Sequence, residues 1–183
     1  MRKIKLQRKE ILKYIIEKGL QASIPSVRVD ACDKELLELI KKCGQKSLTI
    51  APEAHQELRY KLNKHIPDKI YVDFMKLAQE AGFKKIKTYI LIGNQTKQDI
   101  DKTVNFVKEL KSNFKGKIYL SINPIVPKPT TALEKTTFDK KELKNQINYM
   151  KKQLKPINID YKFNTLKYSY LEWYYANLET PLP

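Results

Sequence analysis

Two residues of opposite charge, Arg28 and Asp30, stand two positions apart in a short stretch of extended character. Side chains at positions i and i+2 of a strand point to the same face, so the two can pair with each other or face a ligand together. An ion pair inside the protein and a polar substrate pocket are therefore both open interpretations. No nucleophile triad, zinc signature or phosphate-binding loop pattern accompanies them.

Each of four predicted strands ends near a polar residue or a glycine. The arrangement of the strands explains why these four residues can act together. Each strand has one apolar and one polar face, whereas a parallel sheet covered by helices on both sides is apolar on both. The simplest geometry is a curved sheet with helices outside and a polar hollow inside, with the site at the carboxyl ends of the strands. The strands are predicted at 24–30, 47–51, 85–92 and 117–122, and they end near Asp30, Glu53, Gly93 and Asn123.

Helices are predicted between these strands by apolar residues that recur three and four positions apart. This alternation predicts an α/β fold with parallel strands, and four strands are too few to close a barrel, which needs about eight. The sequence therefore predicts an open, partial (β/α) barrel. The helices are predicted at 3–18, 33–43, 54–64, 68–81, 97–112, 139–155 and from about 166, with an extended piece at 157–163.

Length and composition limit the classes of protein. The 183 residues are typical of one globular domain, and no apolar run approaches the roughly 20 residues that span a bilayer, so a cytoplasmic protein is expected. The 36 Lys and Arg against 20 Asp and Glu give a net charge of +16, which favours polyanionic partners such as RNA. Genome base composition alone can produce the same lysine-rich pattern.

Four segments together resemble the later part of radical S-adenosylmethionine (radical SAM) enzymes. The subgroup that they resemble most is the one whose members often carry a cobalamin-binding domain before the radical core, so cobalamin is a further implied cofactor. The core of this family is a six-stranded open (β/α) barrel, and the four strands predicted here correspond to its third to sixth strands. The segments are 23–30 (SIPSVRVD), 45–54 (QKSLTIAPEA), 89–100 (YILIGNQTKQDI) and 121–130 (SINPIVPKPT).

The resemblance implies that the chain has three regions and that it forms only part of an enzyme. A basic helix in 1–22 packs on the barrel, 23–135 forms the carboxyl-terminal portion of the barrel, and 136–183 adds a basic helix, a strand and an aromatic helix. The chain is then part of a radical SAM enzyme, either a shortened form or one product of a split gene, and is not active alone. It contributes half of the S-adenosylmethionine pocket for reductive cleavage to a 5′-deoxyadenosyl radical. The alternative is a non-catalytic basic module that binds RNA or a partner protein.

The resemblance also implies which residues contact the ligands. Glu53 faces the ribose or amino group of S-adenosylmethionine, and Arg59 and Lys64 meet its carboxylate. Glu53 can instead cap the helix predicted from 54, and the two cations can instead be solvated surface charges. The full set of implied S-adenosylmethionine contacts is Thr49, Glu53, Arg59, Lys64, Gly93, Gln95, Ser121 and Asn123, and the implied substrate pocket is Arg28, Asp30 and Tyr89.

The segment after the third predicted strand has two interpretations. In the family a glycine, here Gly93, lets the backbone contact the adenine region, and an acidic residue follows where this chain has Gln95. An amide hydrogen-bonds but carries no charge, so an electrostatic role is lost. Alternatively, residues 94–96 are only the entry to the next helix and satisfy its free N–H groups. His55 and His65 are isolated near helix ends, where surface positions are expected.

The end of the chain concentrates aromatic residues beside a lysine-rich helix. Aromatics interleaved with cations can stack on single-stranded nucleic acid. They can also cover the exposed end of the barrel or contact a partner domain. The aromatic residues are Tyr161, Phe163, Tyr168, Tyr170, Trp173, Tyr174 and Tyr175.

The two cysteines do not match the cluster motif of the family. Its [4Fe–4S] cluster is held by Cys-x3-Cys-x2-Cys, whereas Cys32 and Cys43 are eleven residues apart without a third. That separation is about three helical turns, so a helix carrying both would place them on one face as packing residues. The cluster is therefore expected from a missing amino-terminal part or a partner chain, and no metal ligand is assigned here.

We expect the purified chain alone to be colourless and to hold no stoichiometric iron after anaerobic reconstitution, because it lacks three convergent thiolates. Iron and sulfide analysis with absorption spectroscopy measures this. A stable brown species with about four irons per chain would contradict the packing role of Cys32 and Cys43, once gel filtration has excluded a cluster shared between chains.

Overall fold

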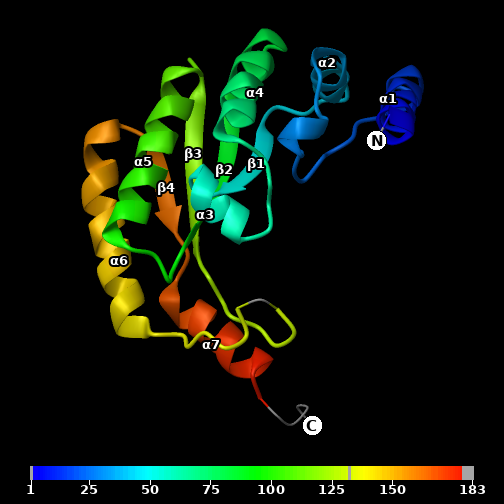
Figure 1. The fold of residues 1–183 in the computed structure, drawn as a ribbon. Helices are drawn as coiled ribbons and strands as arrows, with labels where there is room; N and C mark the ends of the chain where they lie inside the picture. The colour runs from blue at the N-terminus through cyan, green and yellow to red at the C-terminus, as the bar shows by residue number, and fades with distance from the viewer. Residues whose placement is uncertain (1, 132, 179–183) are drawn as a thin grey trace.

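The computed structural model describes residues 2–131 and 133–178, which form a four-stranded parallel sheet with helices. The sheet order is β1-β2-β3-β4, so each strand lies beside the next one in the sequence. Parallel neighbouring strands must be joined by a crossover connection, and successive right-handed crossovers in this order lie on the same face of the sheet. Figure 1 shows the crossover helices α4, α5 and α6 packed against one face. The predicted α/β class is confirmed. The strands are β1 (Leu48–Glu53), β2 (Lys85–Ile92), β3 (Lys117–Pro124) and β4 (Asp160–Phe163).

The helices begin and end close to the predicted positions because their ends carry strong local signals. Asp33 accepts from the N–H of Leu36, and Thr96 and Asp99 form a reciprocal capping box. The helices are α1 (Arg2–Glu17), α2 (Lys34–Lys42), α3 (Gln56–Lys61), α4 (Asp68–Glu80), α5 (Lys97–Ser112), α6 (Lys140–Leu154) and α7 (Leu166–Ala176), with 3-10 turns η1 (Val29–Ala31) and η2 (Lys155–Ile157).

The two faces of the sheet differ as the alternation predicts. In β2, Ile86, Ile90 and Ile92 are buried, while the alternate positions Lys87 and Tyr89 remain partly exposed. The buried face packs against the helices, and no helix of the described residues covers the other face (Figure 1). The register places Lys87 beside Tyr119 and Tyr89 beside Ser121, so polar side chains form rows across the open face.

The strand predicted at 24–30 was wrong. The segment is extended, but it makes one backbone hydrogen bond to β1, from Val27 N–H to Thr49 O at 2.9 Å, and then enters the turn η1. Pro25 has no N–H to donate, which prevents a regular ladder at this edge. The fourth strand comes instead from the extended piece at the other edge, where β4 pairs with β3.

Helix α1 packs on α2 and not along β1. Lys9 contacts Asp33 at 2.9 Å and Glu35 at 2.6 Å, and Leu12 is buried. In Figure 1, α1 and α2 lie beyond the β1 side of the sheet. The β1 edge therefore carries little backbone pairing. No helix in the described part of the chain has the length and apolar character needed to cross a membrane.

Beyond the carboxyl ends of the strands, α7 and the connection after β3 form a separate layer (Figure 1). We call residues 125–131, 133–139 and α7 the lower lobe. Phe138 stacks on Trp173 with 6.1 Å between ring centroids, and Asn177 Nδ2 donates to Pro127 O at 3.1 Å. Lys128 and Glu172 form an ion pair at 2.7 Å. These contacts hold α7 against the connection and place the lobe over the end of the sheet where a site is expected.

Candidate functional site

Strand β1 ends in an irregularity that turns Glu53 out of the regular ladder. The register with β2 shifts between Ile50 and Glu53, and Glu53 adopts φ +67°. A left-handed conformation costs a residue with a Cβ about 1 kcal/mol or more, so surrounding contacts must hold it. Lys64 Nζ lies 3.2 Å from Glu53 Oε1 and also donates to Ala51 O. Glu53 is therefore not the helix cap considered from the sequence, and its half-buried carboxylate has a fixed direction.

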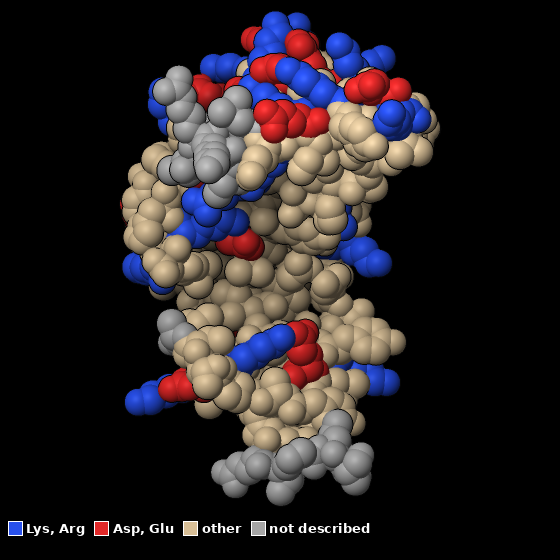
Figure 2. Space-filling view, turned by 90° about the vertical axis from the view of Figure 1, so that its right-hand side faces the viewer, with Lys and Arg blue, Asp and Glu red and all other residues tan. Residues whose placement is uncertain are grey.

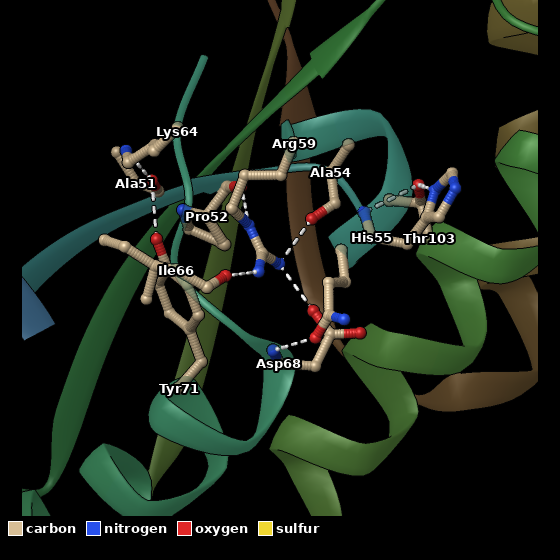
Figure 3. Close-up of polar contacts among 11 residues, drawn as sticks. Ala51, Pro52, Ala54, His55, Arg59, Lys64, Ile66, Asp68, Tyr71 and Thr103 are labelled. Atoms are coloured by element: carbon tan, nitrogen blue, oxygen red, sulfur yellow. Dashed lines mark hydrogen bonds and ion pairs between the residues drawn. The ribbon is translucent and has the colours of Figure 1, made fainter. Parts of the chain in front are cut away.

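Arg59 fixes the chain on both sides of Glu53 (Figure 3). Its Nε donates to Pro52 O at 2.7 Å, and its Nη2 donates to Ala54 O at 2.7 Å. Nη2 also lies 2.7 Å from Asp68 Oδ1, and Nη1 donates to Ile66 O. The side chain has no exposed surface, so in this structure the guanidinium holds protein groups and offers no donor to solvent.

Aromatic rings enclose the Arg59 guanidinium from the helix side. Its Cζ lies 4.4 Å from the ring centroid of Tyr71 and 5.1 Å from that of Phe106. Such stacking stabilises a cation that has left water. Burial raises the pKa of Tyr71 to about 12, and its hydroxyl donates to Ala51 O at 3.3 Å. Three carbonyls, one carboxylate and two rings therefore surround this cation completely enough to offset its desolvation.

His55 is buried, and the expected surface position was wrong. Its side chain is 4% exposed, and its Nδ1 lies 3.1 Å from Thr103 Oγ1, which also accepts the His55 backbone N–H at 3.3 Å. Nε2 is 3.7 Å from Asp99 Oδ1, beyond hydrogen-bond distance. Burial lowers the pKa of His55, and the Asp99 charge partly opposes this. His65 is exposed, as expected.

The turn after β2 brings Gly93 close to the lower lobe. Gly93 has φ +136°, and an added Cβ would lie 3.4 Å from Ile125 Cβ and 3.7 Å from Leu143 Cδ1. Few side chains tolerate this backbone conformation, so glycine is required for the local path. The turn thus approaches the connection after β3 with no side chain between them.

Gln95 is buried and supports the same turn. Its side-chain Nε2 donates to Leu91 O at 3.1 Å, and its backbone carbonyl oxygen accepts from Gln146 Nε2 at 2.9 Å. Its Oε1 is buried without a hydrogen-bond partner among the described residues. Thr96 caps α5, so the helix-entry interpretation holds for Thr96.

The remaining predicted residues divide between the open face and its border. Ser121 is buried beside Tyr89, whose hydroxyl accepts from Lys87 Nζ at 2.9 Å, and Thr49 lies at the β1 edge. Arg28 and Asp30 pair through three hydrogen bonds of 2.8, 3.1 and 3.0 Å, which is the ion-pair interpretation. Arg28 is 69% exposed, so this pair lies at the surface.

A cavity of about 640 Å³ opens between the carboxyl ends of the strands and the lower lobe. We call it the chamber, and Figure 2 shows the surface hollowed above the lower lobe. Of the predicted site residues, only Asn123 lines it, and Asn123 Oδ1 is buried without a hydrogen-bond partner among the described residues. The other lining residues were not predicted from the sequence, and they include Lys61, Asn63, Asn164 and Ser169. Asn164 follows β4 directly, so a rule based on strand ends would have found it.

The two thiols make contacts within the protein. Cys43 is buried and its thiol donates to Leu12 O at 3.7 Å, while the Cys32 thiol donates to Arg28 O at 3.4 Å. Burial raises the pKa of Cys43. Across residues 2–131 and 133–178, no three His, Cys, Asp or Glu side chains gather in a group that could hold a metal ion.

Comparisons with known proteins give one family, one longer relative and one similar fold. The family model described as the radical SAM superfamily matches residues 2–107. The uncharacterized protein MJ0966 of Methanocaldococcus jannaschii is 34% identical over 163 residues, which are 86% of this chain and 36% of that protein. The chain thus spans little more than a third of the length of this curated relative.

A solved structure is similar in fold. The crystal structure of SuiB from Streptococcus suis matches with a TM-score of 0.59 and 17% sequence identity, over 94% of this chain and 40% of that chain. At this identity the likeness shows the fold alone. The parallel sheet with its helices therefore corresponds to part of a larger structure in that protein.

Replacing Arg59 by leucine is expected to lower the free energy of unfolding by about 3 kcal/mol or more, because Asp68 and three carbonyls lose their buried donor. Urea unfolding followed by circular dichroism measures the change. Arg28→Leu is the matched control, since it also removes an arginine paired with an aspartate, but at the surface, where about 1 kcal/mol or less is expected. Equal losses in the two variants would contradict the role assigned to Arg59.

The stability of the protein is expected to decline as the pH falls from about 7.5 through about 6.5, the pKa of an unfolded histidine. The folded protein keeps His55 neutral, so the unfolded state binds more protons in this window and stability rises with pH. His55→Gln should flatten the decline, and His65→Gln, at the exposed histidine, should not. Urea midpoints across this pH range provide the measurement, and an unchanged slope in His55→Gln would refute the assignment.

Proposed function

The chain belongs to the radical SAM superfamily, and we propose that it forms the part of the S-adenosylmethionine pocket at the carboxyl ends of β1, β2 and β3. The observation that carries the proposal is the left-handed Glu53 at the end of β1, held by Lys64 beside its carboxylate and by Arg59 on the adjoining carbonyls. Strain of this kind persists where surrounding contacts fix it, and it is concentrated at functional sites. In this family, S-adenosylmethionine and a [4Fe–4S] cluster together supply the radical chemistry.

The residues at this edge suit the polar parts of S-adenosylmethionine. The Glu53 carboxylate can accept hydrogen bonds from two ribose hydroxyls or from an ammonium group. Gly93 allows a ligand to approach the backbone after β2. Asn123 lines the chamber, so in this proposal it serves the substrate and not S-adenosylmethionine. Thr49 and Ser121 border the same edge from β1 and β3.

The proposed roles of Arg59 and Lys64 differ from those that the family pattern implies. We do not place Arg59 on the ligand, because all its observed partners are protein groups and it has no exposed surface. Its role in the proposal is to position Glu53. Lys64 is partly exposed beside Glu53 and can turn toward a carboxylate. Gln95 is buried and supports the β2–α5 turn. Arg28, Asp30 and Tyr89 stay proposed substrate contacts, since Arg28 is exposed and Tyr89 is partly exposed.

The cluster requires thiolates that the chain does not bring together. The family motif has three cysteines, and here Cys43 is buried against α1 while Cys32 lies ahead of α2. We therefore propose that a separate region or a partner chain supplies the cluster and pairs along the β1 edge, where the described residues make one backbone hydrogen bond. Mass spectrometry of the native protein identifies this component by its three-cysteine motif. A requirement for cobalamin remains a prediction.

In the assembly that contains this cluster-bearing component, Glu53→Gly is expected to weaken S-adenosylmethionine binding about 10-fold, because glycine keeps the left-handed backbone but removes the carboxylate. Glu53→Gln should retain more affinity through its amide oxygen. Glu57→Ala removes an exposed carboxylate on α3 and is the matched control. Isothermal titration calorimetry of the assembly measures all three.

Gly93→Val should also weaken binding, because it strains the backbone and brings a side chain against Ile125. Gly19→Val is its control, since Gly19 has φ +64° and nothing within 4 Å of an added Cβ. If Glu53→Gly and Gly93→Val both bind S-adenosylmethionine as tightly as their controls, the proposed pocket is in the wrong place.

A further inference from the structure

The chamber has the size and composition of a binding site for part of a substrate. Its volume of about 640 Å³ lies within the range of small-molecule sites in proteins. Leu91 comes from the sheet, Ile125 and Val126 follow β3, and Leu133 comes from the lower lobe, so opposite walls are apolar. Flat apolar ligands fit between such walls without leaving polar groups unpaired.

Polar groups at fixed positions interrupt these apolar walls. Asn123 Oδ1 is buried without a partner among the described residues, which costs about 1 to 3 kcal/mol unless a ligand donates to it. An asparagine side chain both accepts and donates, which matches the edge of a nucleobase. Lys61 of α3 and Lys128 of the lower lobe both line the chamber. Their positive charges can compensate the phosphate charge of a ligand.

Beside the chamber, α7 exposes aromatic rings that have no role in the core. Tyr168 is 71% exposed, and Tyr174 and Tyr175 are also exposed. Tyr168 and Tyr175 are seven residues apart, so they lie on the same side of the helix. Tyr170 and Trp173 on the inner side stack with Phe138 and make α7 a rigid support.

Lysines accompany both the inner and the exposed side of α7. Lys140 Nζ lies 3.0 Å from the ring centroid of Tyr170, and Lys167 is exposed on α7. The whole chain carries a net charge of +16, which attracts a polyanion to this surface. Exposed rings combined with lysines are the arrangement on which successive bases of a single strand stack.

We propose that a single-stranded nucleic acid is the substrate, lying along α7 on Tyr168 and Tyr175 and placing one unpaired base in the chamber. The inference rests on the proposed function, because the chamber opens at the same sheet edge as Glu53 and Gly93. Stacking on α7 supplies affinity, and Asn123 contacts the edge of the inserted base. Phosphates on either side of that base lie near Lys61 and Lys128.

The test uses the full chain and a fluorescein-labelled 12-nucleotide single-stranded RNA of mixed sequence, followed by fluorescence anisotropy. The double variant Tyr168→Ala/Tyr175→Ala is expected to bind about 10-fold or more weakly, because base stacking on an aromatic ring contributes about 1 to 3 kcal/mol per base. Tyr14→Ala is the matched control, since Tyr14 is 58% exposed on α1 and has Lys18 over its ring. Circular dichroism establishes that both variants are folded.

A second measurement separates base recognition from attraction of charge. Inorganic polyphosphate of equal charge should displace the RNA far less effectively than an unlabelled oligonucleotide, and affinity should fall as salt rises from about 50 to 200 mM. Asn123→Leu fills the chamber with an apolar group and should reduce the affinity of a strand with bases more than that of an abasic strand. Equal displacement by polyphosphate, or equal affinities of the Tyr14 and α7 variants, would overturn the proposal.

The outcomes distinguish this inference from the proposed function. If RNA binding fails while the assembly binds S-adenosylmethionine through Glu53 and Gly93, only the substrate class is wrong. If RNA binding depends on α7 while the Glu53 and Gly93 variants bind S-adenosylmethionine normally, the proposed pocket falls and a basic RNA-binding module replaces it.

Discussion

The buried guanidinium of Arg59 is the interaction on which the geometry of this edge depends. The chain must leave β1 at Pro52, pass through a left-handed residue at Glu53 and enter α3, which leaves the carbonyls of Pro52 and Ala54 without ladder partners. Arg59 donates to both carbonyls and to Asp68 at the start of α4, so it joins β1, α3 and α4 in one network. A lysine could not do this, because it lacks the planar fork that reaches several acceptors at fixed angles. The direction of Glu53 is therefore a consequence of a side chain that no ligand needs to touch.

The sheet imposes a second constraint because its helices cover one face only. The buried face holds Ile86, Ile90 and Ile92, whereas the open face carries Lys87, Tyr89 and Ser121. Helices on both faces would force these polar groups out of water without partners. The β1 edge is also thinly paired, since Val27 makes the single backbone contact there. Both features leave one face and one edge of the sheet open to further contacts, and the chain spans 36% of the length of its relative MJ0966.

The sequence predicted the elements whose signals are local and failed where burial depends on distant partners. Helix α5 was placed correctly because its apolar spacing and its Thr96 and Asp99 cap lie within a few residues of each other. The segment at 24–30 alternates like a strand, but Pro25 and the turn at Val29 prevent a regular ladder. The alternation of side chains does not report either feature, so it predicted a strand that does not form. His55 and Arg59 were expected at the surface or on a ligand, whereas their partners Thr103 and Asp68 come from other helices.

The chamber could not be predicted for the same reason, since it exists only where the lower lobe lies over the sheet. Residues that line it come from α3, β2, β3 and α7, and they extend in the sequence from Lys61 to Glu172. Gly93 links this space to the edge where Glu53 lies, because a Cβ on Gly93 would contact Ile125, and Ile125 is a wall of the chamber. That distance of 3.4 Å is an ordinary van der Waals contact, so glycine is required here by its φ of +136° and not by lack of space. The glycine that we propose opens the backbone after β2 to S-adenosylmethionine therefore also lies against the wall of the chamber, and the two proposed sites share one structural element.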